Sequence, residues 1–143
     1  LNLSNAELKD VVFARARLKN ARLRESNLRN AYFESADLQS ANCYGADMRG
    51  AKLNGADLRN THFTLARLNH ADLSGASLAQ TGLENAELDS SIVNELDWLA
   101  RMTQTGRDSI RGISAIDSRY EIDSVRTAFG YQYMLLKKNR VRN

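Results

Sequence analysis

Proline is absent from this sequence, cysteine occurs once, and aromatic residues make up only 7% of the chain. With the single cysteine, Cys43, no internal disulfide can form, and cysteine usage does not indicate a compartment. No apolar run approaches the roughly 18 residues that a membrane-spanning helix needs, so the sequence predicts no membrane span. A core with so few aromatics must be built mainly from leucine and alanine.

A period of five residues runs through the first two thirds of the chain. Every fifth residue from Leu3 to Val93 is apolar, at 19 positions without a slip in register. Two residues before each of them lies a second column, which is alanine at 13 of its 19 positions. The remaining positions of each unit are mostly polar. Such strict self-similarity indicates a repeat protein.

A five-residue period fits neither an α-helix nor a continuous strand. On a helix each step of five rotates the apolar position by roughly 140°, so the apolar stripe would wrap the whole circumference. On a strand an odd period sends successive leucines to opposite faces. A bend in every unit resolves the conflict, because a short extended segment then points alanine and leucine inward and the residue between them outward.

The corner position supports this interpretation. The corner position is the second residue after each residue of the apolar column. At 13 of 18 such positions it is Gly, Asn, Asp or Ser, which tolerate left-handed or tightly turned backbone. Five corners depart from the pattern and are predicted to have less secure geometry: Arg15, Glu25, Leu65, His70 and Gln80.

Stretches such as ADLQSANCYGADMRGAKLNGADLRN resemble the pentapeptide-repeat family, whose motif is A(D/N)LXX, and the resemblance covers about residues 1–94. It implies an all-β solenoid, a right-handed quadrilateral β-helix with four units per coil and nearly five coils. With 20 residues per coil, Cys43 stacks against Phe63 and is expected to be a buried core residue rather than a reactive thiol.

The repeat ends after Val93, and residues 95–143 form a second region. Ser91 is a possible N-cap for a first helix, and a capping-box pattern at Ser118 and Glu121 predicts a second one that continues through Ile122, Val125 and Phe129. Residues 131–138 fit either a helix or a strand. The apolar residues with helical spacing in the first segment are Ile92, Leu96, Trp98, Leu99 and Met102.

We expect this mainly helical tail to cap the open end of the β-helix, with Trp98 as the plug, because that end exposes unpaired backbone. Leu96, Trp98, Leu99 and Met102 are the expected cap contacts, and a homodimer through the same surface is the alternative. The chain begins at Leu1 without an initiator methionine and already in register, which indicates a fragment or a processed form whose other end is covered by something else.

No catalytic, cofactor or metal site is predicted. The histidines, His62 and His70, lie at outward or corner positions, and an inward Cys43 cannot pair with His62 as nucleophile and base. Acidic side chains at the polar motif position are interpreted as a solvated or ladder-forming surface rather than a catalytic pair. These acids are Asp37, Asp47, Asp57 and Asp72.

Charge is unevenly distributed along the repeat. Residues 1–30 carry seven basic and three acidic side chains, a net of +4, whereas residues 31–94 carry four basic and eight acidic ones, a net of −4. Ordinary solubilising charge is the simpler explanation, and binding of an acidic partner is the sharper one. The candidate partner-binding residues are Arg15, Arg17, Lys19, Arg22, Arg24 and Arg29.

These features favour a non-enzymatic scaffold or protein-interaction module, a domain of a larger bacterial protein, whose partner is another protein. The alternative implied by the family resemblance is a DNA-mimicking modulator of DNA gyrase. Imitating DNA requires a continuous acidic surface, since the duplex carries a charge about every 1.7 Å, and the net charge of +3 disfavours it. Direct binding of nucleic acid through the basic residues is disfavoured as well.

Overall fold

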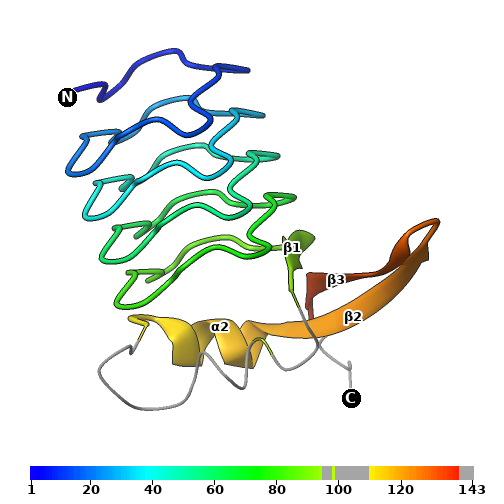
Figure 1. The fold of residues 1–143 in the computed structure, drawn as a ribbon. Helices are drawn as coiled ribbons and strands as arrows, with labels where there is room; N and C mark the ends of the chain where they lie inside the picture. Colours follow the sequence, from blue (N-terminus) through cyan, green and yellow to red (C-terminus); the bar gives the residue numbers. More distant parts are fainter. Residues whose placement is uncertain (95–97, 99–109, 139–143) are drawn as a thin grey trace.

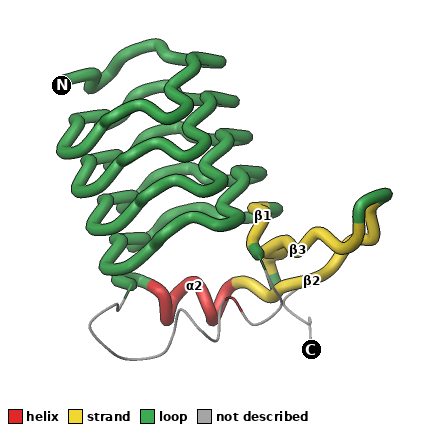
Figure 2. The backbone as a smooth tube through the Cα atoms, in the orientation of Figure 1, coloured by secondary structure: helices red, strands yellow, loops and turns green. Residues whose placement is uncertain are grey.

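The computed structural model describes residues 1–94, 98 and 110–138, and shows a rod of stacked coils with a small α/β region at one end (Figure 1). Each five-residue unit contributes one residue to a parallel bridge, and the bridged partners lie 20 residues apart, as in Asn2 with Arg22 and Arg22 with Asn42. Four units therefore complete one turn. Since each unit contributes only a single bridged residue, the rod is drawn as loop in Figure 2.

The bend in each unit is visible in the backbone hydrogen bonds. The N–H of Ala6 donates to the carbonyl of Leu3 across the corner, and the same turn recurs in later units. Between corners, the N–H of Leu3 donates to the carbonyl of Arg22 in the next coil at 2.7 Å, and the N–H of Arg22 donates to the carbonyl of Leu1 at 2.9 Å. The backbone is thus paired from coil to coil, which confirms the prediction of one bend every five residues.

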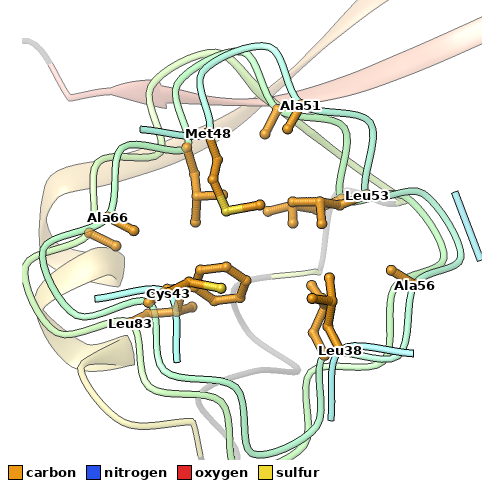
Figure 3. Packing of buried hydrophobic residues seen from close by; sticks show 14 of the residues in the cluster. Leu38, Cys43, Met48, Ala51, Leu53, Ala56, Ala66 and Leu83 are labelled. Atoms are coloured by element: carbon orange, nitrogen blue, oxygen red, sulfur yellow. The ribbon is translucent and has the colours of Figure 1, made fainter. Parts of the chain in front are cut away.

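The apolar columns fill the interior, as Figure 3 shows for the middle of the rod. Leu23, Leu53 and Leu58 have no exposed surface, and the alanines beside them are equally buried. Cys43 is fully buried as predicted, and its column places it against Phe63 of the next coil, where the N–H of Cys43 donates to the carbonyl of His62. Burial raises the pKa of the Cys43 thiol to about 12, so this side chain is a core residue.

Hydroxyl residues replace alanine at four buried positions of the small column and keep their hydrogen bonds. Ser26 donates to the carbonyl of Leu23, whereas Thr61, Thr81 and Ser91 each donate to a carbonyl 23 residues earlier, at 2.7 to 2.8 Å. A buried hydroxyl without a partner would be costly. The two threonines and Ser91 therefore add links between coils, and Ser26 adds one across its own corner.

Every corner residue from Asn5 to Ser90 has a positive φ, including the five that depart from the expected residue types. Arg15, Glu25, Leu65, His70 and Gln80 have φ between 54° and 60°, the same range as the asparagines. The expected irregularity at these corners is therefore wrong, because the pairing to the coils on either side imposes one backbone conformation on every unit.

The C-terminal region contains a three-stranded antiparallel sheet and one described helix. The elements are β1 (Ser91–Val93), α2 (Ile113–Arg119), β2 (Tyr120–Thr127) and β3 (Gly130–Lys137), and the sheet order is β1-β3-β2. Strand β1 also closes the last coil, because Ile92 bridges Asp72 in parallel while it pairs with Met134 of β3. The β2–β3 hairpin extends beyond the side of the rod (Figure 1).

Two predictions about this region are wrong. The helix expected from Ser118 through Ile122, Val125 and Phe129 is not present, because the chain leaves α2 at Tyr120 and continues as strand β2. Pairing of β2 with β3 satisfies the backbone of both segments, and their β-branched and aromatic residues suit a strand. Residues 131–138, left open between helix and strand, are strand through Lys137. A mainly helical tail is thus wrong for the described residues.

The first predicted helix is only partly described. Ser91 and Ile92 belong to β1, so a helix capped by Ser91 is wrong. Trp98 is buried, with 3% of its surface exposed, and belongs to the core cluster, as expected of a plug. Leu96, Leu99 and Met102, the other expected cap contacts, lie outside the described residues.

The C-terminal region supplies partners for the last coil. The N–H of Leu83 donates to the carbonyl of Arg111 at 2.9 Å, and the N–H of Leu88 donates to the hydroxyl of Tyr120 at 3.1 Å. Ser90 donates its N–H to Leu135 in β3. An open coil edge would leave such groups unpaired, and residues 110–138 supply partners for these three.

Candidate interaction surfaces on the rod

The outward side chains form four ladders, one on each side of the coil. Ladder 1 begins at Asn2, ladder 2 at Glu7, ladder 3 at Val12 and ladder 4 at Arg17, and each continues in steps of 20 residues. Seven ladder residues are Asn or Asp whose side-chain oxygen accepts the N–H two residues further on, at 3.0 to 3.4 Å. The acids Asp37, Asp47, Asp57 and Asp72 are among them.

This local hydrogen bond explains the polar motif position, since a short side-chain acceptor stabilises the turn that follows it. The four acids thus occupy outward positions on ladders 2, 3 and 4, where each also stabilises the turn that follows it. Asp57, for example, accepts from the N–H of Arg59 at 3.2 Å and from the amide of Gln39 in the preceding coil at 2.7 Å.

The six candidate partner-binding residues are distributed over three sides of the rod and do not form a single patch. Arg17 and Lys19 belong to the ladder 4 side, Arg22 and Arg24 to the neighbouring ladder 1 side, and Arg15 to the corner before them. We call these five exposed cations the basic belt. The sixth residue, Arg29, lies beside ladder 2, away from the belt.

Few contacts within the described structure neutralise the positive charge of the basic belt. The Arg24 guanidinium lies over the ring of Tyr44, 4.8 Å from its centroid, a cation–π contact that holds the arginine while leaving its charge in place. Within the described part of the chain, no ion pair involves a residue of the belt.

A groove runs along the ladder 2 side, across four successive coils. Its volume is about 520 Å³, and it is open to solvent along one side. Cationic and amide side chains predominate in its lining, together with one carboxylate. The lining residues are Arg29, Asn30, Arg49, Gly50, Arg67, Asn69, His70 and Glu87.

Sequence reasoning found only Arg29 of this cationic set. Arg49 and Arg67 lie in the stretch whose net charge is acidic, and they were missed because charge was counted along the chain. Counting around a 20-residue coil would have found them, since Arg29 and Arg49 occupy equivalent positions in consecutive coils.

Two arginine–aspartate pairs with the same local geometry stand on different sides of the rod. Arg49 binds Asp47 through Nε at 2.7 Å and Nη2 at 2.5 Å, and Arg59 binds Asp57 at 2.9 and 2.6 Å. The hydrogen bonds from these guanidinium groups hold the pKa values of Asp47 and Asp57 below their usual range, against the opposing effect of partial burial. Only the Arg49 pair borders the groove.

A smaller hollow of about 280 Å³ lies where the cap meets the rod, lined by Asn60, His62, Gln80 and Arg111. The Arg111 guanidinium contacts Nδ1 of His62 at 2.9 Å and Oε1 of Glu84 at 3.3 Å. Gly82 lies beneath it, and a Cβ there would meet Nη2 of Arg111 at 2.7 Å. This cluster ties the cap to ladder 1.

Across residues 1–94, 98 and 110–138, no group of three or more His, Cys, Asp or Glu side chains is placed to hold a metal ion. Among the same residues, no helix has the length and apolar character that crossing a bilayer requires.

Comparison with known proteins gives a consistent result for the rod. The family model described as "Pentapeptide repeats" matches in eight copies, over residues 1–30, 16–55, 26–64, 41–80 and 66–95. No curated protein matches the chain.

Solved structures of pentapeptide repeat proteins are similar to this chain. One from Nostoc sp. PCC 7120 is 28% identical with a TM-score of 0.50, covering 77% of this chain and 74% of its own. One from the thylakoid lumen of Arabidopsis thaliana is 30% identical with a TM-score of 0.45, and the match covers 62% of this chain and 66% of that one. Rfr23 of Cyanothece 51142 is 36% identical with a TM-score of 0.40, and the match covers 66% of this chain and 60% of that one. The chain thus spans just under two thirds of the length of the last two.

Proposed function

This chain belongs to the pentapeptide-repeat family, and from that premise we propose that it is a non-enzymatic scaffold that binds an acidic surface of a protein partner through its basic belt. The observation that carries the proposal is the belt itself, with five exposed cations on two adjacent sides of one coil and no ion pair among them in the described structure. By analogy with the family we also infer a right-handed winding and nearly five coils.

A rigid rod suits this role because the backbone that carries the belt is already ordered. Hydrogen bonds between coils hold these segments, so a partner would order only the belt side chains on binding. Exposed cations also accelerate the encounter with an acidic surface through electrostatic attraction. Salt screens this attraction over about 8 Å at physiological ionic strength.

Modulation of DNA gyrase by imitation of DNA is less well supported. None of the four ladders is acidic along its length: ladder 4 has Asp37 and Asp57 but begins with Arg17, and ladder 2 alternates Asp47, Arg67 and Glu87. A mimic of the duplex needs regularly spaced negative charge.

The proposal is tested by charge reversal within the belt. We expect the double variant Arg22→Glu and Arg24→Glu to lose the proteins that the wild-type chain retains in a pull-down from cells that produce it, measured by quantitative mass spectrometry after nuclease treatment. Lys52→Glu, on ladder 3, is the matched control and should keep them. Retention of the same partners by the double variant would refute binding through the belt.

A further inference from the structure

Three guanidinium groups, from Arg29, Arg49 and Arg67, line the ladder 2 groove from three consecutive coils. Coils stack about 4.8 Å apart, so Arg29 and Arg49, which are 20 residues apart, are held as near neighbours of like charge. Such an arrangement is unfavourable in isolation and becomes favourable when an anion lies between the two groups.

Many hydrogen-bond donors of these arginines have no partner within the described chain. Arg49 uses Nε and Nη2 for Asp47, which leaves part of its five-donor fork unoccupied. Nε of Arg67 lies 3.7 Å from Oε2 of Glu87, beyond hydrogen-bond distance. The Arg29 side chain forms no hydrogen bond or ion pair with another described residue. The groove therefore presents donors as well as charge.

An amide at the floor of the groove adds a second observation. Asn69 lines the groove, and its Oδ1 is buried without a hydrogen-bond partner among the described residues. A buried polar atom without a partner is costly. Because Asn69 lines the groove, its N–H₂ group adds a neutral donor for an oxyanion to those of the arginines.

We propose that this groove is an oxyanion-binding site that holds a phosphate or carboxylate group between Arg29 and Arg49, with Arg67 and His70 at its far end. Guanidinium groups bind both anions through paired N–H donors. Glu87, which also lines the groove, opposes anion binding through its own negative charge. The site goes beyond the scaffold function, because it lies on a different side from the basic belt and requires no protein partner.

The repeat supplies a matched pair of variants for the test. Arg49→Gln and Arg59→Gln each remove an arginine that binds the aspartate two residues earlier, but only Arg49 lines the groove. We expect inorganic phosphate, titrated into the full chain and followed by calorimetry, to bind at least about tenfold more weakly to Arg49→Gln, and unchanged to Arg59→Gln. Arg29→Gln, which breaks no ion pair in the described structure, should weaken binding in the same way.

Glu87→Gln gives a change of the opposite sign. Removing this carboxylate should strengthen phosphate binding several-fold, because Arg67 loses its acidic neighbour. A parallel titration with a glutamate-rich peptide distinguishes phosphate from carboxylate as the bound group. Binding of either ligand that depends on Arg49 supports the site, and the tighter ligand shows which anion the groove prefers.

Two results would overturn the proposal: absence of binding by either anion at millimolar concentration, or equal losses for Arg49→Gln and Arg59→Gln. The belt variant Arg22→Glu and Arg24→Glu should bind phosphate normally, so failure of the scaffold function and failure of the groove are distinguishable.

Discussion

Leu65 shows how strongly the fold imposes its backbone on a single residue. It occupies a corner with φ of 60°, a conformation that usually belongs to glycine or asparagine, and 47% of its side chain is exposed. A non-glycine residue in this region costs roughly 1–2 kcal/mol relative to its preferred conformations. Two backbone hydrogen bonds offset that cost. The N–H of Leu65 donates to the carbonyl of Glu84, and the N–H of Ala66 donates to the carbonyl of Phe63 across the turn.

Replacing Leu65 with asparagine should therefore stabilise the rod. We expect the free energy of unfolding to rise by up to about 1 kcal/mol, because asparagine tolerates left-handed backbone and little apolar burial is lost. The reverse change at an equivalent corner, Asn60→Leu at φ of 58°, should destabilise by a similar amount. Denaturant unfolding of the two variants measures both effects, and two shifts of the same sign would contradict the argument.

At the scale of elements, the cap is joined to the last coil by specific polar contacts. Tyr120 begins strand β2 and is 1% exposed, and its hydroxyl accepts the N–H of Leu88 in the final turn of the rod. The Arg119 guanidinium, 5.6 Å from the ring centroid of Tyr120, also donates to the carbonyl of Ala86. These bonds seal the ladder 2 side of the last coil.

Tyr120→Phe should weaken the seal without changing its shape. The Leu88 N–H then loses its acceptor in a buried position, at a cost of roughly 1–3 kcal/mol. Tyr131→Phe, in a side chain that is 65% exposed, is the control and should change stability by less than about 0.5 kcal/mol. Amide hydrogen exchange should show loss of protection at Leu88 in the first variant only, and unchanged protection there would show that the hydroxyl is not its partner.

The repeat could be predicted from sequence because each unit encodes its own bend. Leu53 and Leu58 are buried where the five-residue register places them, and even Leu65 adopts the common corner conformation. The structure of the tail could not be predicted in this way, because it depends on pairing between segments that are distant in sequence. Ile122, Val125 and Phe129 have helical spacing, yet the pairing of Tyr120–Thr127 with Gly130–Lys137 makes their segment a hairpin.

The groove eluded sequence reasoning for a related reason. Arg29, Arg49 and Arg67 come from three separate units, and they converge only once the number of units in a coil is known. The five-residue period gives the bend but not the number of sides, which the family resemblance supplied. The basic belt, by contrast, lies within one stretch of sequence, and its five residues were found as a local excess of charge.

At the scale of the whole molecule, stability depends on a continuous stack. Each coil contacts only its neighbours through backbone bonds and a shared column of side chains, so a defect in the middle interrupts both halves. Leu58 lies in such a place and has no exposed surface. Its carbonyl accepts the N–H of Thr61 across the corner at 3.0 Å and the hydroxyl of Thr81 at 2.8 Å.

Leu58→Asp should consequently unfold the rod as a unit. A carboxylate at this position would be buried without a partner, at a cost of several kcal/mol, which is a large part of the roughly 5–15 kcal/mol that stabilises a typical domain. We expect loss of the thermal transition by circular dichroism and earlier elution from a size-exclusion column, as for an expanded chain. The outward Lys52→Glu variant should melt close to the wild-type chain. A melting curve for Leu58→Asp that matches the wild type would mean that Leu58 is not inside the stack, and the assignment of every ladder, belt and groove residue to its side of the rod would be wrong with it.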